Sequence, residues 1–157
     1  MIARRATPAD VAELVRVINH AYEVEADMFI DKRTNEADVS ERLARPNATF
    51  LVIDDDTPGM LAAGVYVEHE GDRGYFGMLA VDPAHQGQGL GRKLVNAAEV
   101  YCADAGCRAL DIEVVHLRTE LPGFYQSLGF NTVGQTPYPE SARTKLPVEL
   151  IHMTKSL

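Results

Sequence analysis

The stretch that decides the predicted fold is Leu79-Ala80-Val81-Asp82-Pro83-Ala84-His85-Gln86-Gly87-Gln88-Gly89-Leu90-Gly91-Arg92. Residues 75–81, before the turn, are mostly apolar and predict a strand, while residues 90–105 predict an amphipathic helix. The glycines at 87, 89 and 91 let the backbone bend and let a ligand approach it closely. A helix that begins there points unpaired N–H groups and the positive end of its dipole into the turn. The stretch therefore predicts a site for a phosphate-type anion.

Two common phosphate loops do not fit this stretch. A Walker A loop requires G-x-x-x-x-G-K followed by Ser or Thr, and a dinucleotide fingerprint requires G-x-G-x-x-G. Counted from Gly87, both motifs need a glycine at position 92, which is Arg92. In addition, no Ser or Thr follows Lys93. A phosphotransferase that binds a nucleotide is therefore disfavoured.

The pattern that is present is Gln86-x-x-Gly89-x-Gly91, preceded by Val81-x-Pro83. It resembles the pyrophosphate loop of the GNAT superfamily of acyl-CoA N-acyltransferases, in which Arg or Gln is followed by x-x-G-x and then by Gly or Ala. A second motif, Tyr125-x-x-x-Gly129-Phe130, stands further along the chain. It is similar to the Y-x-x-x-G-F segment that ends a short helix in this family. With both motifs in the family's order, the resemblance covers nearly the whole chain.

The rest of the sequence predicts elements that agree with this resemblance. Strands are expected at residues 2–6, 49–54, 60–68, 110–115, 130–133 and 147–153, and further helices at residues 8–22, 35–45 and 120–128. A bulge is expected at Gly64, inside a strand. The fold class is therefore α+β with one domain over residues 1–157. The resemblance implies a mixed, twisted sheet of six to seven strands, flanked by helices and splayed between the strands that end at residues 81 and 115.

Composition narrows the class of protein. The chain of 157 residues has a formal net charge of -8, which argues against a nucleic-acid partner. Cys102 and Cys107 are the only cysteines, and their spacing without nearby histidines predicts core thiols and no metal site. The sequence shows neither a signal peptide nor an apolar run that could span a membrane. We therefore expect a cytoplasmic enzyme without a membrane partner.

The resemblance implies acetyl-CoA as co-substrate and assigns residues to it. Backbone N–H groups from Gly87 through Gln88, Gly89, Leu90 and Gly91 to Arg92 would hold the pyrophosphate, with the Gln86 side chain in the same region. The backbone of the segment Leu79-Ala80-Val81 would pair with the pantetheine arm. Arg118 replaces an Asn that contacts pantetheine in many members, so its role must differ: a phosphate contact, a clamp on a substrate carboxylate or an exposed cation.

The resemblance also implies direct attack of an amine on the thioester. Tyr125 matches the family's tyrosine and is the expected proton donor to the leaving thiolate. The family's base varies, so Glu113, Glu68, His69 and His116 are all candidates. Glu113 is preferred because strand alternation directs its side chain away from the apolar Ile112 and Val114.

The acceptor amine, from a small molecule or a peptide, remains open at this stage. In this fold the segment between the first two helices usually forms a wall of the acceptor site. Phe29 and Arg33 in that segment predict an acidic or amino-acid-like substrate, whereas Glu23 and Glu25 would instead seat an ammonium group. An alternative function is a non-catalytic acyl-CoA sensor, which is disfavoured because Tyr125 accompanies an intact loop. By analogy with the fold, a homodimer is also expected.

Overall fold

The computed structural model describes residues 1–139 and 143–157. Its sheet has seven strands in the order β1-β2-β3-β4-β5-β7-β6, which confirms the predicted α+β class. The strands are β1 (Ala3–Arg5), β2 (Ala48–Asp54), β3 (Leu61–Glu70), β4 (Arg73–Val81), β5 (Ala109–Val115), β6 (Asn131–Pro137) and β7 (Glu149–Ser156). The α-helices are α1 (Val11–Ala21), α2 (Glu36–Leu43), α3 (Leu90–Asp104) and α4 (Leu121–Ser127), and short 3-10 helices are η1 (Pro8–Asp10), η2 (Tyr22–Glu25) and η3 (Pro83–His85).

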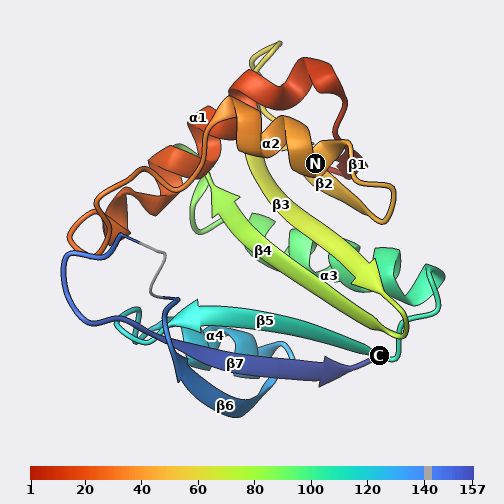
Figure 1. Cartoon of the computed structure of the whole chain (residues 1–157). Helices are drawn as coiled ribbons and strands as arrows, with labels where there is room; N and C mark the ends of the chain where they lie inside the picture. Colours follow the sequence, from red (N-terminus) through yellow and green to blue (C-terminus); the bar gives the residue numbers. More distant parts are fainter. Residues whose placement is uncertain (140–142) are drawn as a thin grey trace.

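The sheet is splayed between β4 and β5, its only parallel neighbours. They pair over three positions, from Arg73 opposite Ala109 to Tyr75 opposite Asp111. Beyond Tyr75 the two strands separate, and Figure 1 shows them close together near the C-terminus and diverging toward the opposite side. This confirms the predicted splay and leaves the edge of β4 that faces β5 without a partner strand.

A bulge lies in β4, opposite the position where the sequence predicted one. Gly64 pairs with Ala80 but Tyr66 pairs with Gly77, so β4 contains one extra residue there. Met78 in this segment has a φ of 53°, which is unusual for a residue with a side chain. The extra residue inverts the alternation of the strand. Phe76 packs into the core beneath α3, whereas Met78 and Ala80 pack into the core beneath α1.

Two cores hold the sheet, one on each face. The first joins α3 and α4 to one face of β2, β3, β4, β5 and β7, and the second joins α1 and α2 to the other face of β2, β3 and β4. Figure 1 shows α1 and α2 together on one side of β3 and β4, with α3 behind them. The first core therefore spans both halves of the splayed sheet and holds them together where β4 and β5 do not pair.

The predicted ends of the last two strands were wrong. The sequence placed β6 at residues 130–133, but it continues to Pro137 and pairs with β7 along its length. All its side chains are exposed, so it lacks the apolar alternation on which the prediction depended. Likewise, β7 begins at Glu149 and ends at Ser156, beyond the predicted end at Met153, because its last residues pair with β5.

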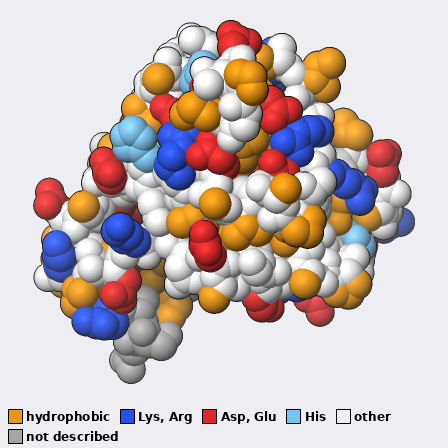
Figure 2. Space-filling model, turned by 90° about the horizontal axis from the view of Figure 1, so that it is seen from above, with side chains coloured by type: hydrophobic (Ala, Val, Ile, Leu, Met, Phe, Trp, Pro, Cys, Tyr) orange, Lys and Arg blue, Asp and Glu red, His pale blue; other side chains and the backbone are white. Residues whose placement is uncertain are grey.

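The surface over α1 and α2 carries intermixed acidic and basic side chains (Figure 2). Ion pairs account for part of this pattern: Arg4 lies 2.9 Å from Asp10, and Arg16 lies 2.7 Å from Glu13. Within the part of the chain that the structure describes, no helix combines the length and the apolar character that crossing a membrane requires.

Gly74 fixes how closely α3 approaches the paired end of β4. A Cβ at this position would lie 2.4 Å from Cys102 Sγ and 2.9 Å from Cys102 Cβ. Gly74→Ala should therefore lower the free energy of unfolding by about 1–3 kcal/mol through overpacking, measured by urea denaturation. Gly134→Ala is the matched control, since a Cβ there meets nothing within 4 Å. Adding Cys102→Ala should restore part of the loss, and a Gly74→Ala protein as stable as the control would refute this account.

Candidate active site

A cavity of about 550 Å³ occupies the opening between β4 and β5. Its floor is made by residues 75–79 of β4 and 112–115 of β5, and α4 contributes Leu121 and Tyr125. The opposite wall is the segment from Tyr22 to Arg33 that follows α1, together with Tyr138. The cavity brings together these residues predicted from the sequence: Leu79, Glu113, Tyr125, Phe29, Arg33, Glu23 and Glu25.

The unpaired edge of β4 provides backbone hydrogen-bonding groups along this opening. Leu79 lines the cavity, directly after the bulge at Met78. Ala80 is 1% exposed and its side chain packs beneath α1, so only its backbone is available to a ligand. Val81 packs against the other core. The residues predicted to meet the pantetheine arm thus present an open strand edge rather than side chains.

The glycine-rich turn lies at the N-terminus of α3, outside this cavity. Gly87 and Gly89 have φ values of 81° and 77°, which glycine adopts without strain. Gly89 is the N-cap of α3, and no side chain caps the first turn. The side chains of Gln86 and Arg92 are exposed, whereas Leu90 is buried in the core. Gln88 Oε1 lies 3.4 Å from His85 Nδ1. The first N–H groups of this helix therefore face the turn.

Gly91 connects the turn with the cavity. A Cβ built on Gly91 would lie 3.8 Å from Phe124 in α4 and 3.9 Å from Val81 at the end of β4. The first turn of α3 therefore lies beside α4, the helix that carries Tyr125. The glycine turn and the cavity are therefore neighbours in the fold.

Two side-chain contacts fix the start of this turn. Asp82 is buried, accepts a hydrogen bond from the Ala84 N–H at 3.0 Å and pairs with Arg16 of α1 at 2.9 Å. His85 Nε2 lies 2.8 Å from Asp55 Oδ2 in the turn between β2 and β3. The Asp55 contact raises the pKa of His85. The sequence did not predict these two ion pairs, because the partners in each are far apart in the chain.

Tyr125 reaches the cavity from α4 and is only 6% exposed. Its ring packs against Phe124, Phe130 and Phe76, with centroid separations of 5.0, 5.8 and 6.0 Å. This burial raises the pKa of the Tyr125 hydroxyl well above its usual value. The hydroxyl therefore keeps its proton throughout the neutral range.

Among the four candidate bases, only Glu113 lines the large cavity. Its carboxylate belongs to a side chain that is 41% exposed, and it lies 3.7 Å from His152 Nδ1. Glu68 accepts a hydrogen bond from the Tyr66 hydroxyl at 2.5 Å. His116 Nδ1 accepts the N–H of Glu149 at 2.9 Å. His69 lies near the closed end of the sheet, where it pairs with Gly74.

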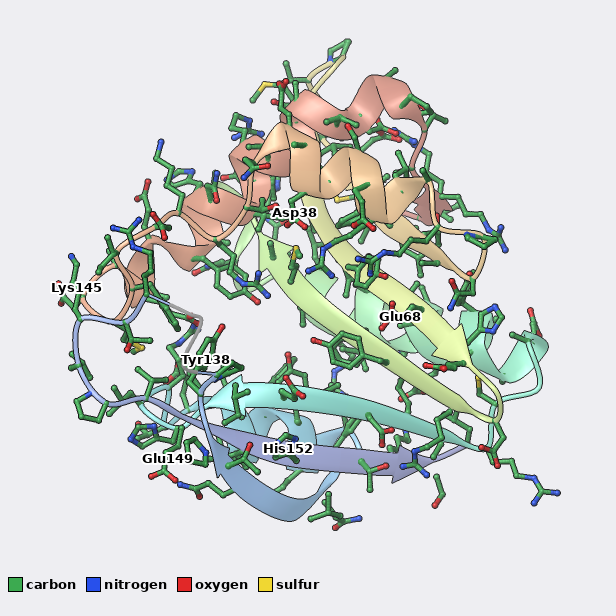
Figure 3. All side chains as sticks on the ribbon, in the orientation of Figure 1. Asp38, Glu68, Tyr138, Lys145, Glu149 and His152 are labelled. Carbon is green, nitrogen blue, oxygen red and sulfur yellow. The ribbon has the colours of Figure 1, made fainter. Side chains whose placement is uncertain are left out.

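The outer wall of the cavity joins two segments that are far apart in sequence. Phe29 forms an isolated antiparallel bridge with Thr144, and backbone hydrogen bonds of 2.8–2.9 Å flank it on both sides. The Phe29 ring packs against Tyr138 at a centroid distance of 5.1 Å. Figure 3 shows Tyr138 beside the opening between β4 and β5, whereas Lys145 lies at the outer margin of the molecule. The Phe29 ring is thus part of the wall.

The structure pairs Arg118 with two carboxylates of the chain itself. Its Nη1 lies 2.9 Å from Glu25 Oε2, and its Nε lies 2.6 Å from Glu120 Oε1. Glu25 is 6% exposed, and its burial raises its pKa while Arg118 opposes that rise. Arg118 is therefore a clamp on the chain's own carboxylate, tying the loop after β5 to η2. Glu25 is consequently not free to seat a substrate ammonium group.

The structure also adds Tyr75 of β4 to the site. Tyr75 lines the large cavity and a second hollow on the same side, which also includes Glu113 and His152. Burial raises the pKa of the Tyr75 hydroxyl, and the negative charge of Glu113 adds to the effect. Its position follows the β4 alternation before the bulge, a pattern that was available in the sequence.

Comparisons with known proteins agree with this arrangement. A sequence profile described as the acetyltransferase (GNAT) family matches residues 14–130. A Bacillus subtilis (strain 168) protein assigned as a ribosomal protein bS18-alanine N-acetyltransferase is 32% identical over 119 residues, covering 74% of this chain and 76% of the relative.

Two solved structures share the fold. The ribosomal-protein-alanine N-acetyltransferase from Brucella melitensis superposes with a TM-score of 0.81 at 18% identity, covering 100% of both chains. The yncA protein of Salmonella typhimurium, solved with acetyl-CoA, has a TM-score of 0.73 at 23% identity and covers 100% of this chain and 94% of its own. These identities establish the fold alone, and they confirm the fold that the two motifs predicted.

Removing the Arg118 clamp should destabilise the folded protein. Arg118→Gln leaves the Glu25 carboxylate buried without its partner, which should lower the free energy of unfolding by about 3 kcal/mol, measured by urea denaturation. Because the Glu25 pKa is already raised and rises further in the variant, the deficit should shrink as the pH falls and Glu25 takes up a proton. Glu120→Gln, which removes the exposed partner, should cost no more than about 1 kcal/mol. Equal losses in the two variants would contradict the clamp.

Proposed function

The chain belongs to the GNAT family of acetyltransferases and is an acetyl-CoA-dependent N-acetyltransferase, and we propose that Glu113 and Tyr125 are its base and acid. The observation that carries the proposal is that both side chains line one cavity, at the place where the edge of β4 is open. The acceptor is a primary amine of a small molecule or a peptide. The Bacillus relative, named for an alanine of a ribosomal protein, supports an amine acceptor.

Acetyl-CoA fits the glycine turn and the open edge of β4. The pyrophosphate would bind the N–H groups of the turn from Gly87 to Arg92, because this helix start has no side-chain cap and its N-cap is glycine. The dipole contributes about 0.3–1 kcal/mol. Hydrogen bonds from several aligned N–H groups to a charged acceptor therefore supply most of the affinity. The open edge from Leu79 to Val81 would hold the pantetheine arm as an added strand.

The reaction needs two proton transfers that this pair can perform. Glu113 takes a proton from the ammonium form of the acceptor, and the free amine attacks the thioester carbonyl. The C–S bond then breaks and Tyr125 donates its proton to the departing sulfur. The new amide nitrogen loses a proton, which restores the hydroxyl of Tyr125. A well-placed acid or base contributes roughly 10²–10⁴ in rate.

A cytoplasmic location and a homodimer remain part of this proposal. The buried free thiols of Cys102 and Cys107 support a reducing compartment. The exposed strand β6 at the end of the sheet, which spans Asn131–Pro137, supports pairing of two copies.

Two neighbouring glycines test the assignment of the acetyl-CoA loop. Gly89→Ala forces a side chain into φ 77°, at a cost of about 1–2 kcal/mol, and should weaken acetyl-CoA binding about tenfold by calorimetry, since the loop must shift to relieve the strain. Gly91→Ala should bind almost as the wild type, because its Cβ makes ordinary contacts at 3.8 and 3.9 Å. Unchanged affinity in Gly89→Ala would count against the loop.

Base and acid variants should differ in their pH dependence. Glu113→Gln should lower kcat/KM about 10²-fold near neutral pH, and the deficit should narrow as the pH rises and the amine loses its proton unaided. Tyr125→Phe should show a loss that stays constant over the same range, because the raised pKa of Tyr125 keeps it protonated.

The readout is acceptor-dependent release of CoA thiol, measured with a panel of amines. Acetyl-CoA binding by each variant serves as the control for folding. A Tyr125→Phe deficit that disappears at high pH, or a Glu113→Gln enzyme with wild-type turnover near neutral pH, would refute the assigned roles. Binding of acetyl-CoA without amine-dependent thiol release would instead favour the sensor.

A further inference from the structure

Arg33 presents a cation to the acceptor side of the cavity. The side chain is half-buried, lines the cavity and lies over the Tyr22 ring at 5.2 Å from its centroid. Among the described residues, no carboxylate lies within salt-bridge distance of its guanidinium. Stacking on Tyr22 holds the flat face of the group and leaves its N–H edge for a ligand.

Two partly or fully buried carboxylates near Arg33 already have other partners. Glu25 is bonded to Arg118, as described above. Asp38 accepts hydrogen bonds from Thr34 at 2.7 Å and from Arg42 at 2.9 Å. The exposed Glu23 and Asp31 also line the cavity, but neither lies within salt-bridge distance of Arg33.

Charges of opposite sign lie on the two sides of the same cavity. Burial raises the pKa of Tyr75, the charge of Glu113 adds to the rise and the charge of Arg33 opposes it. Burial likewise raises the pKa of Tyr138, with Arg33 opposing the rise and Glu113 adding to it. Arg33, Glu113 and the two tyrosines all line the same cavity, with Arg33 on the wall and Glu113 on the sheet. The wall also carries other charged side chains: Glu23, Asp31, Lys32, Arg143 and Lys145.

We propose that the acceptor is an amine that itself carries a carboxylate, as an amino acid does, and that Arg33 binds this carboxylate while the amine faces Glu113. This assignment rests on the proposed function and names the substrate class of the same site. A guanidinium matches a carboxylate with two parallel hydrogen bonds, which a neutral amide cannot accept in the same way. A peptide N-terminus places an amide where the amino acid has its carboxylate, so it lacks the group that Arg33 recognises.

Matched pairs of acceptors test the inference. Each protein amino acid is compared with its own carboxamide, and kcat/KM is measured from thiol release with acetyl-CoA. The amide has the less basic amine, so chemistry alone favours the amide. We expect the wild type to prefer the acid form of at least one amino acid by about tenfold or more.

Variants of Arg33 should remove that preference without affecting the donor. Arg33→Gln should bring the ratio of acid to amide close to one, mainly through the KM of the acid, while acetyl-CoA binding stays unchanged. Arg33→Lys keeps the positive charge but loses the planar guanidinium that can form two parallel hydrogen bonds, so it should give an intermediate ratio of acid to amide turnover. Arg108→Gln is the charge-matched control, since Arg108 is exposed and outside the cavity lining, and it should behave as the wild type.

Several results would overturn the inference. Equal use of acids and amides by the wild type would do so, as would turnover confined to amides or peptide N-termini. A preference for the acid that survives in Arg33→Gln would also refute it. Acetyl-CoA binding without turnover of any amino acid would also refute the inference. In that case, assays with amines that lack a carboxylate would test the acetyltransferase function itself. Loss of acetyl-CoA binding in the wild type is the different result that refutes the proposed function itself.

Discussion

The structure depends on where the pairing of β4 with β5 stops. The strands share only the positions from Arg73 to Tyr75, so the remaining edge of β4 has no neighbour. Unpaired backbone groups of a central strand must find other partners, and an extended ligand can provide them. The α4 helix lies beside the first turn of α3, where a Cβ on Gly91 would meet Val81 and Phe124 at ordinary contact distances. The open edge of β4 and the position of Tyr125 in the cavity are thus associated with one interruption in the sheet.

An open sheet needs support from elsewhere, and three features supply it. The core beneath α3 contains side chains from both halves of the sheet, so the halves stay joined without the missing pairing. The Arg118–Glu25 pair ties the loop after β5 to η2. The bridge between Phe29 and Thr144 joins the two halves on the far side of the opening. The bulge at Met78 adds strain, of order 1–3 kcal/mol for such a backbone conformation. Backbone strain of this kind is typical of functional sites, and it lies beside Leu79, within the cavity.

The sequence predicted what local pattern determines. The glycine turn, the Tyr125 motif and the element types all follow from residues close together in the chain, and the structure places them as expected. Three features escaped prediction because they depend on distant partners. The position of the bulge is set by pairing with β3, and Met78 gives no local sign of a positive φ. The far end of β6 is held by backbone pairing with β7 and by the contact between Thr136 and His152, and it has no buried side chains. For Arg118 the sequence indicated a ligand contact or an exposed cation, because its partner Glu25 lies 93 positions away in the chain.

The two proposed catalytic groups differ most in their access to solvent, and this difference suits their roles. Acetylation of an ammonium group releases one proton overall, which must leave the site. Glu113 is 41% exposed and lies between the cavity and a second hollow, so the proton that it accepts can pass to water. Tyr125 is buried among aromatic rings, and its hydroxyl keeps its proton until a stronger base than water forms beside it. The departing thiolate is such a base. The same burial makes Tyr125 a weaker acid than an ordinary tyrosine, so its donation to sulfur depends on the proton that the new amide nitrogen returns to it.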